Sequence, residues 1–213
     1  MGQTLIANRQ ISGGLDGWIP AEQTWTYASA TTITVPSGAA SKYQKGDKIK
    51  LTQTTVKYFY IVSVADTVLT VTGGSDYTVA DAAITLPYFS KIENPQGFPH
   101  WFNYTATIGG FSSAPTMITK FKLSATSCVL NLASTTNGTS NATTYTVSLP
   151  ITAKTQTNYS WRAWALVTDN GTGANGSLYI GSGGGSLSFY KDSLGSFTSS
   201  GLKSGNGQVI YEI

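Results

Sequence analysis

The sequence predicts an all-β protein, and three observations support this. Charged residues make up only 11% of the 213 residues, where about a quarter is usual. Apolar residues alternate with polar ones in runs of five to nine residues, and Gly, Pro and Asn turns separate these runs. No amphipathic helix of useful length is found in the chain. The length allows either one large β domain or two small ones.

The first half predicts a small β-barrel or sandwich over residues 18–90. Its expected strands are short and close together, at 31–35, 47–54, 56–64, 67–72 and 82–89. In 47–54, Ile49 and Leu51 alternate with lysines, which predicts a solvated lysine face, with a polyanion site as the alternative. The run 56–64 is apolar on both faces and rich in β-branched and aromatic residues, which is typical of a central strand.

Two segments flank this domain. Residues 1–17 predict an attachment arm, because the Gly-rich stretch that follows its apolar residues separates it from the strands. Its apolar contacts are expected from Leu5, Ile6, Ile11 and Leu15. Residues 91–100 hold two prolines and a glycine without periodicity, and they predict a linker.

The second half, residues 101–213, predicts a larger antiparallel β-sandwich. Its expected strands lie at 117–123, 128–132, 143–151 and 159–168, within 178–190 on either side of a glycine-rich bend at 181–185, and at 208–213. An Asn137-Gly138 turn precedes the strand at 143–151. Cys128 is the single cysteine and lies in an apolar run, so we expect it to be buried as a small hydrophobe.

The strand at 159–168 has two apolar faces. One face carries Trp161, Ala163, Ala165 and Val167, which suit a sandwich core. The opposite face carries Arg162, Trp164 and Leu166. Something must cover this second face: either a loop of the same chain, such as the glycine-rich 181–185, or another subunit.

The residues needed for catalysis are scarce. His100 is the single histidine, and no Gly-x-Ser-x-Gly turn is present. The carboxylates of Glu22, Glu93 and Glu212 are far apart in sequence, so no glycosidase pair is indicated. One His and one Cys cannot form a zinc site. We therefore expect no enzyme activity, no catalytic residue, no cofactor and no metal.

The charge and hydropathy of the chain limit the kinds of partner that we expect it to bind. The net charge of +3 is small and scattered, which gives no indication of nucleic-acid binding. No apolar run is long enough for a membrane span, so we expect no membrane insertion. The N-terminus lacks the basic start and apolar core of a signal peptide, so we expect synthesis in the cytoplasm.

Several stretches of both halves resemble known proteins. The first is "TWTYASATTITVP" with "YQKGDKIKLTQTTVKYFYIVSV" and "LTVTGGSDYTV", which resembles a module of tailed-bacteriophage structural proteins. The second is "GTSNATTYTVSLPITA" with "DNGTG" and "GQVIYEI", which resembles the C-terminal β domain of phage tail-fibre and minor structural proteins. Together they cover residues 18–213.

The resemblance implies a virion component made in the host cytoplasm, a homotrimer with a jelly-roll-like C-terminal half. Its expected interface residues are Arg162, Trp164 and Leu166, and its arm would join other virion proteins. We expect a tail appendage or adhesin knob, which would contact a host cell-surface glycan or protein. Alternatives are a capsid decoration protein or head fibre, and, outside the virion, a carbohydrate-binding module or cryptic hydrolase.

Overall fold

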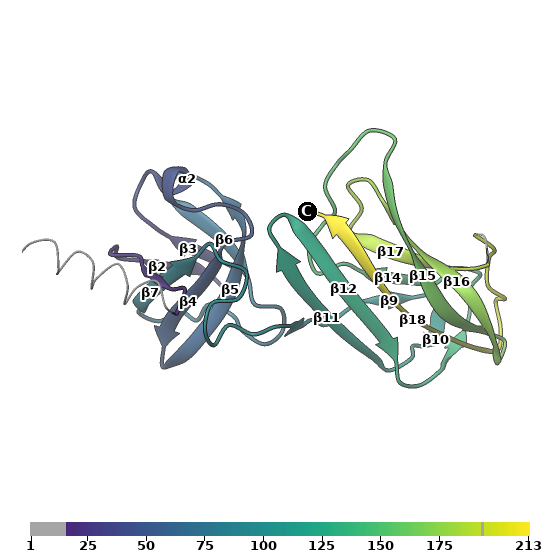
Figure 1. Cartoon of the computed structure of the whole chain (residues 1–213). Helices are drawn as coiled ribbons and strands as arrows, with labels where there is room; N and C mark the ends of the chain where they lie inside the picture. The colour runs from purple at the N-terminus through teal and green to yellow at the C-terminus, as the bar shows by residue number, and fades with distance from the viewer. Residues whose placement is uncertain (1–15, 193) are drawn as a thin grey trace, which may run out of the picture. The chain divides into compact units, whose positions relative to one another are not determined.

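The computed structural model describes residues 16–192 and 194–213 (Figure 1). The chain divides into two compact units, Met1–Phe102 and Asn103–Ile213. Each unit is built on its own antiparallel sheet, and the fold is of the jelly-roll-like β-sandwich type, with one of the sheets curled into a half-barrel. The all-β prediction is therefore confirmed. The predicted arm residues Leu5, Ile6, Ile11 and Leu15 lie outside the described residues.

The first unit contains seven strands and one helical turn among its described residues. They are β1 (Ile19–Pro20), β2 (Thr26–Ser29), β3 (Thr32–Thr34), α2 (Ala39–Lys42), β4 (Lys48–Gln53), β5 (Thr55–Val64), β6 (Val68–Thr72) and β7 (Thr85–Ser90). The order across the sheet is β1-β7-β4-β5-β6-β3-β2. The run 56–64 thus forms the central strand β5, as its two apolar faces predict.

The core of the first unit follows from alternation along β4 and β5. Ile49 and Leu51 on β4 are fully buried, as are Phe59 and Ile61 on β5. Successive side chains of a strand point to opposite faces, so a period of two places all four on the core side. Across the same core Tyr43 meets aromatic neighbours edge to face, the favoured geometry for such rings.

The prediction of a solvated lysine face on β4 is wrong. Lys48 is only 3% exposed, and its ammonium lies 5.9 Å from the ring centre of Tyr60. The ammonium of Lys50 lies between Trp18 at 4.7 Å and Tyr88 at 4.6 Å. Burial lowers the pKa of Lys50, and the nearby Asp16 carboxylate opposes this. Aromatic rings from distant segments cover the lysine stems, which alternation alone does not reveal.

The segment 91–100, predicted as a linker, packs on the first unit. The indole N–H of Trp18 donates a hydrogen bond to the carbonyl oxygen of Gln96 at 2.8 Å. The ring of Phe98 is buried and lies 5.0 Å from that of Tyr60, edge to face. These contacts order the segment although its sequence has no strand period.

The described residues of the second unit form eleven strands. They are β8 (Phe102–Asn103), which begins at the last residue of the first unit, β9 (Ile108–Gly109), β10 (Phe111–Ser113), β11 (Met117–Ser124), β12 (Ser127–Ser134), β13 (Gly138–Ser140), β14 (Thr146–Ser148), β15 (Ser160–Asp169), β16 (Thr172–Gly181), β17 (Ser186–Lys191) and β18 (Leu202–Glu212). The main order is β8-β11-β12-β18-β15-β16-β17-β14-β9, and β13 pairs with both β10 and β18. The last strand, β18, lies between β12 and β15 (Figure 1).

The second unit buries its aromatic side chains between segments that are distant along its sheet. Tyr145, just before β14, meets Phe111 of β10, a strand that does not pair with β14, edge to face at 4.8 Å. The hydroxyl of Tyr211 on β18 donates a hydrogen bond to the carbonyl of Ile151 at 2.9 Å. The sheet therefore curls until distant strands share one core, as in a sandwich.

Most predicted strands of the second half are present. The runs at 117–123, 128–132 and 159–168 form β11, β12 and β15, and Cys128 is buried. The predicted strand at 143–151 is shorter, because only Thr146–Ser148 stays in the ladder with β17. The strands β16 and β18 begin earlier than predicted, since their first halves hold Gly, Asn and Ser without apolar alternation.

Candidate functional site

The strand β15 exposes one of its two apolar faces. It pairs with β16 along its full length and with β18 along its second half. Trp161, Ala165 and Val167 are buried, as their positions predict. On the opposite face Trp164 is 83% exposed and Leu166 is 64% exposed. An indole exposed to this degree in the middle of a regular strand is unusual, because Trp is highly buried on average.

No part of the described chain covers this face. The glycine-rich 181–185 stretch could have shielded Trp164, but the 83% exposure of Trp164 excludes that alternative. Arg162 lies on the same face, and its guanidinium stands 5.3 Å from the ring centre of Tyr179 on the next strand. The structure therefore places Arg162, Trp164 and Leu166 together on one open surface, which we call the Trp164 face.

Amide side chains border the apolar centre of the Trp164 face. Leu166 stands opposite Asn175 on β16 and opposite Asn206 on β18. The side-chain oxygen of Asn206 accepts a hydrogen bond from the backbone N–H of Ser134 at 2.7 Å, which fixes the orientation of the amide. Ile210, also on β18, adds a further exposed apolar side chain. The face thus combines apolar centres with short amides, a composition suited to protein or sugar contact.

Three hollows lie on the Trp164 face. The first has a volume of about 340 Å³ and is lined by Arg162, Ala163, Trp164, Gly176, Ser177, Asp192 and Leu194. A second, of about 320 Å³, is lined by Trp164, Ala165, Leu166, Asn175, Asn206 and Gly207. A third, of about 460 Å³, begins beside Leu166 and extends over Thr168, Gly173 and Ala174. Trp164 therefore projects between two hollows.

The sequence pattern found the centre of this face and missed its border. Asn175, Ser177 and Asn206 lie in Gly-rich stretches that show no apolar period, so nothing marked them as one surface. The Asn-Gly pairs at 175–176 and 206–207 resemble turn signals, yet both lie inside strands. Only the register with β15 brings them to either side of Leu166.

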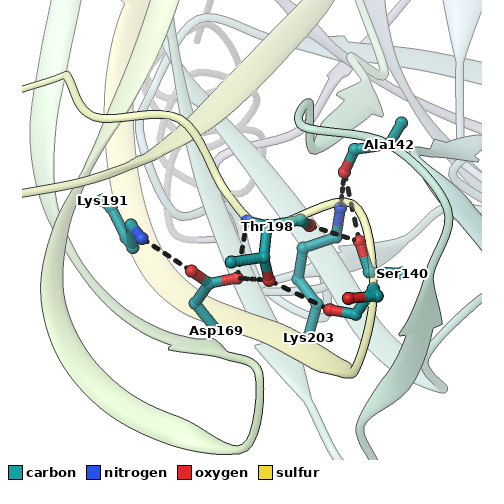
Figure 2. A network of polar contacts seen from close by, with 7 residues as sticks. Ser140, Ala142, Asp169, Lys191, Thr198 and Lys203 are labelled. Carbon is teal, nitrogen blue, oxygen red and sulfur yellow. Dashed lines mark hydrogen bonds and ion pairs between the residues drawn. The ribbon is translucent and has the colours of Figure 1, made fainter.

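A second polar cluster is buried at the end of β15 (Figure 2). The carboxylate of Asp169 accepts hydrogen bonds from the Lys191 ammonium at 2.7 Å, and from the backbone N–H and hydroxyl of Thr198. Burial by itself would raise the pKa of Asp169, but the bonds from Lys191 and Thr198 outweigh it and hold the pKa below its ordinary value.

Lys203 is fully buried in the same region. Its ammonium donates hydrogen bonds to the carbonyl oxygens of Ala142 at 3.0 Å and Thr144 at 2.8 Å. Phe111, Tyr145 and Phe197 place their rings around it, the nearest at 4.6 Å. Burial lowers the pKa of Lys203, and the Asp169 carboxylate opposes this.

The geometry of this cluster suits a structural role. Ser140 and Lys203 both donate hydrogen bonds to the carbonyl of Ala142 (Figure 2). The Ser140 hydroxyl also reaches the carbonyl of Thr198, so its donor is directed at backbone oxygens. Ser140 and Lys203 are buried, and neither lines one of the three hollows. The cluster holds together the ends of strands rather than facing a substrate.

The remaining acid and base candidates stand apart. His100 is exposed, and Glu93 lies 3.7 Å from the buried Lys48 ammonium. Glu212 contacts Lys154. Within residues 16–192 and 194–213, no group of three or more His, Cys, Asp or Glu side chains is placed to hold a metal. In that same part of the chain no helix reaches the length and hydropathy of a bilayer span.

In comparison with known proteins, no family model, curated protein or solved structure matches this chain.

Proposed function

We propose that this chain is a non-enzymatic structural protein of a tailed-bacteriophage particle that assembles as a homotrimer through the Trp164 face. It would stand on the particle surface as a tail appendage or adhesin knob and contact the host cell surface. Residues 1–17 would attach it to other virion proteins. The resemblance of both halves to phage structural proteins supports the class of protein, and the number three rests on that resemblance.

The single observation that supports assembly is the exposure of Trp164 and Leu166. Burying one large apolar side chain is worth about 2 kcal/mol, so the pair offers about 4 kcal/mol in each subunit. Association costs about 4 to 15 kcal/mol in lost motion. The two side chains therefore bring the interface near balance, and a stable oligomer must bury more of the face.

The Trp164 face is large enough for this. The ten residues of β15 extend about 33 Å, and four neighbouring strands span about 19 Å. This gives a planar area of about 630 Å² per subunit, or about 1,300 Å² for two. Specific stable interfaces bury about 1,200 to 2,000 Å² in total. Ile210 and the amides of Asn175 and Asn206 lie within this area and would supply the remaining contacts.

The test is the change Trp164→Glu. It removes the largest apolar contact and would bury a charge, so we expect a loss of more than 4 kcal/mol of association free energy, about a thousandfold. Light scattering should then show folded monomers, because the core face of β15 is untouched. The matched control is Val56→Glu, an exposed apolar residue of the first unit, which should stay trimeric.

A Trp164→Glu variant that remains trimeric would contradict the proposed interface. A wild-type chain that is monomeric at micromolar concentration would contradict assembly altogether. The second candidate function, a carbohydrate-binding module, is favoured by one observation, an exposed indole beside a hollow. It predicts a monomer whose tryptophan fluorescence responds to sugar.

A further inference from the structure

We propose that the 340 Å³ hollow beside Trp164 is a socket that receives the Trp164 side chain of a second copy of this chain. We call this hollow the socket; its lining is Arg162, Ala163, Trp164, Gly176, Ser177, Asp192 and Leu194. The inference rests on the proposed self-assembly and adds how the copies recognise one another. Each copy would insert one indole and accept one.

The size and lining of the socket suit a single aromatic ring. Its 340 Å³ lies at the lower limit of ligand sites, which span about 300 to 1,000 Å³. Leu194 supplies an apolar contact, and Arg162, Ser177 and Asp192 supply polar ones. The indole beside the socket does not occupy it, because Trp164 is 83% exposed. The ring of another copy therefore fits where the chain's own ring does not lie.

The buried hydroxyl of Ser177 indicates which chemical group should enter the socket. The Oγ of Ser177 is buried and has no hydrogen-bond partner among the described residues. Buried polar atoms are nearly always hydrogen-bonded, so this one indicates a missing partner. An indole N–H can only donate, and a serine hydroxyl can accept. The incoming Trp164 would donate its N–H to Ser177 of the receiving copy.

Charges at the rim agree with a second copy as the occupant. Arg162 and Asp192 both line the socket and are exposed, and within the described residues neither forms an ion pair. Arg162 lies on the same side of β15 as Trp164, so it would enter the neighbour with the indole. There it would meet Asp192 of the receiving copy, and a closed ring would repeat this pair at every interface.

The experiment combines two variants that each remove half of the contact. Trp164→Glu lacks the inserting ring and keeps the other six lining residues of the socket. Ser177→Phe fills the socket and keeps the ring. We expect each variant alone to be monomeric where the wild type is trimeric. An equimolar mixture should form one-to-one pairs, detected by native mass spectrometry through the mass difference, with an affinity at least tenfold above that of either variant for itself.

Two further sets of changes test the socket even if the Ser177→Phe variant misfolds. Ser177→Ala removes only the acceptor and should weaken association about fivefold to tenfold. A charge exchange uses exposed positions alone: Arg162→Asp and Asp192→Arg should each weaken the trimer about tenfold, and the double variant should recover most of the loss. Restored assembly in the double variant would place the two residues in contact across copies.

The outcomes separate this inference from the proposed function. A trimeric wild type whose two variants do not pair, with no recovery by charge exchange, overturns the socket and leaves self-assembly standing. A trimer that Ser177→Phe leaves intact overturns the socket as well. A monomeric wild type whose tryptophan fluorescence shifts with N-acetylglucosamine overturns both, and assigns the hollow to a sugar.

Discussion

Replacing the buried Lys203 by Met should change the free energy of unfolding of the second unit by no more than about 2 kcal/mol. Replacing it by Ala should lower this free energy by about 3 to 5 kcal/mol. The two changes remove the same charge and the same hydrogen bonds. They differ in volume, because Met still fills the space among the three aromatic rings.

The magnitudes follow from the contacts of the ammonium. Loss of the donor removes the partner of the Thr144 carbonyl, at about 1 to 2 kcal/mol, while the Ala142 carbonyl keeps its hydrogen bond from the Ser140 hydroxyl. Removing a buried cation recovers several kcal/mol of desolvation. These two contributions nearly cancel for Lys203→Met. Lys203→Ala leaves a cavity as well. A cavity left by Met→Ala costs about 2 to 5 kcal/mol, and we expect a value of about 3 to 5 kcal/mol here.

The stability of the wild type relative to Lys203→Met should depend on pH in one direction. The pKa of Lys203 is lowered in the folded chain, so the unfolded chain binds more protons between that pKa and the ordinary value of 10.5. Stability rises with pH wherever the unfolded state binds more protons. The free energy of unfolding of the wild type should therefore rise relative to that of the Lys203→Met variant as pH rises toward 10.5. The contributions of the other titrating groups cancel in this comparison.

The assay is denaturant unfolding of the full chain, with hydrogen exchange of β12 and β18 amides to isolate the second unit. A Trp164→Glu background removes the concentration dependence that assembly would bring. If Lys203→Met proves as destabilising as Lys203→Ala, the charge itself stabilises the fold and the reasoning about desolvation fails. A difference between wild type and Met variant that falls as pH rises would refute it too.

Three further predictions concern the same chain. Burial raises the pKa of both Tyr43 and Tyr145 to about 12, so the stabilisation from these two groups should be full below pH 10 and fall as pH rises toward 12, with the tyrosinate absorbance of these two side chains appearing only as the chain unfolds. Gly205→Ala should cost about 1 to 3 kcal/mol, read from the urea midpoint, because the new methyl would stand 2.7 Å from the Phe189 ring; an unchanged midpoint would show that the ring moves freely. Deleting residues 1–15 should leave the melting of both units unchanged and abolish incorporation into particles, and normal incorporation would contradict the arm.

The lysines of β4 show a limit of prediction from sequence patterns. Alternation placed Ile49 and Leu51 in the core correctly, because a strand has two faces and one of them is buried. The same pattern assigns Lys48 and Lys50 to water. The rings that cover them, among them Trp18 and Tyr88, come from other segments of the chain. The local sequence of β4 does not predict these contacts.

The Trp164 face shows the same division. The sequence by itself determined the all-β class, most strands and the two-faced character of β15, because these depend on the order of polar and apolar residues along one strand. Only the tertiary structure decided that Asn175 and Asn206 flank Leu166, and that Lys203 is buried. These depend on register between strands that are far apart in the chain, and register is set by the packing of the whole unit.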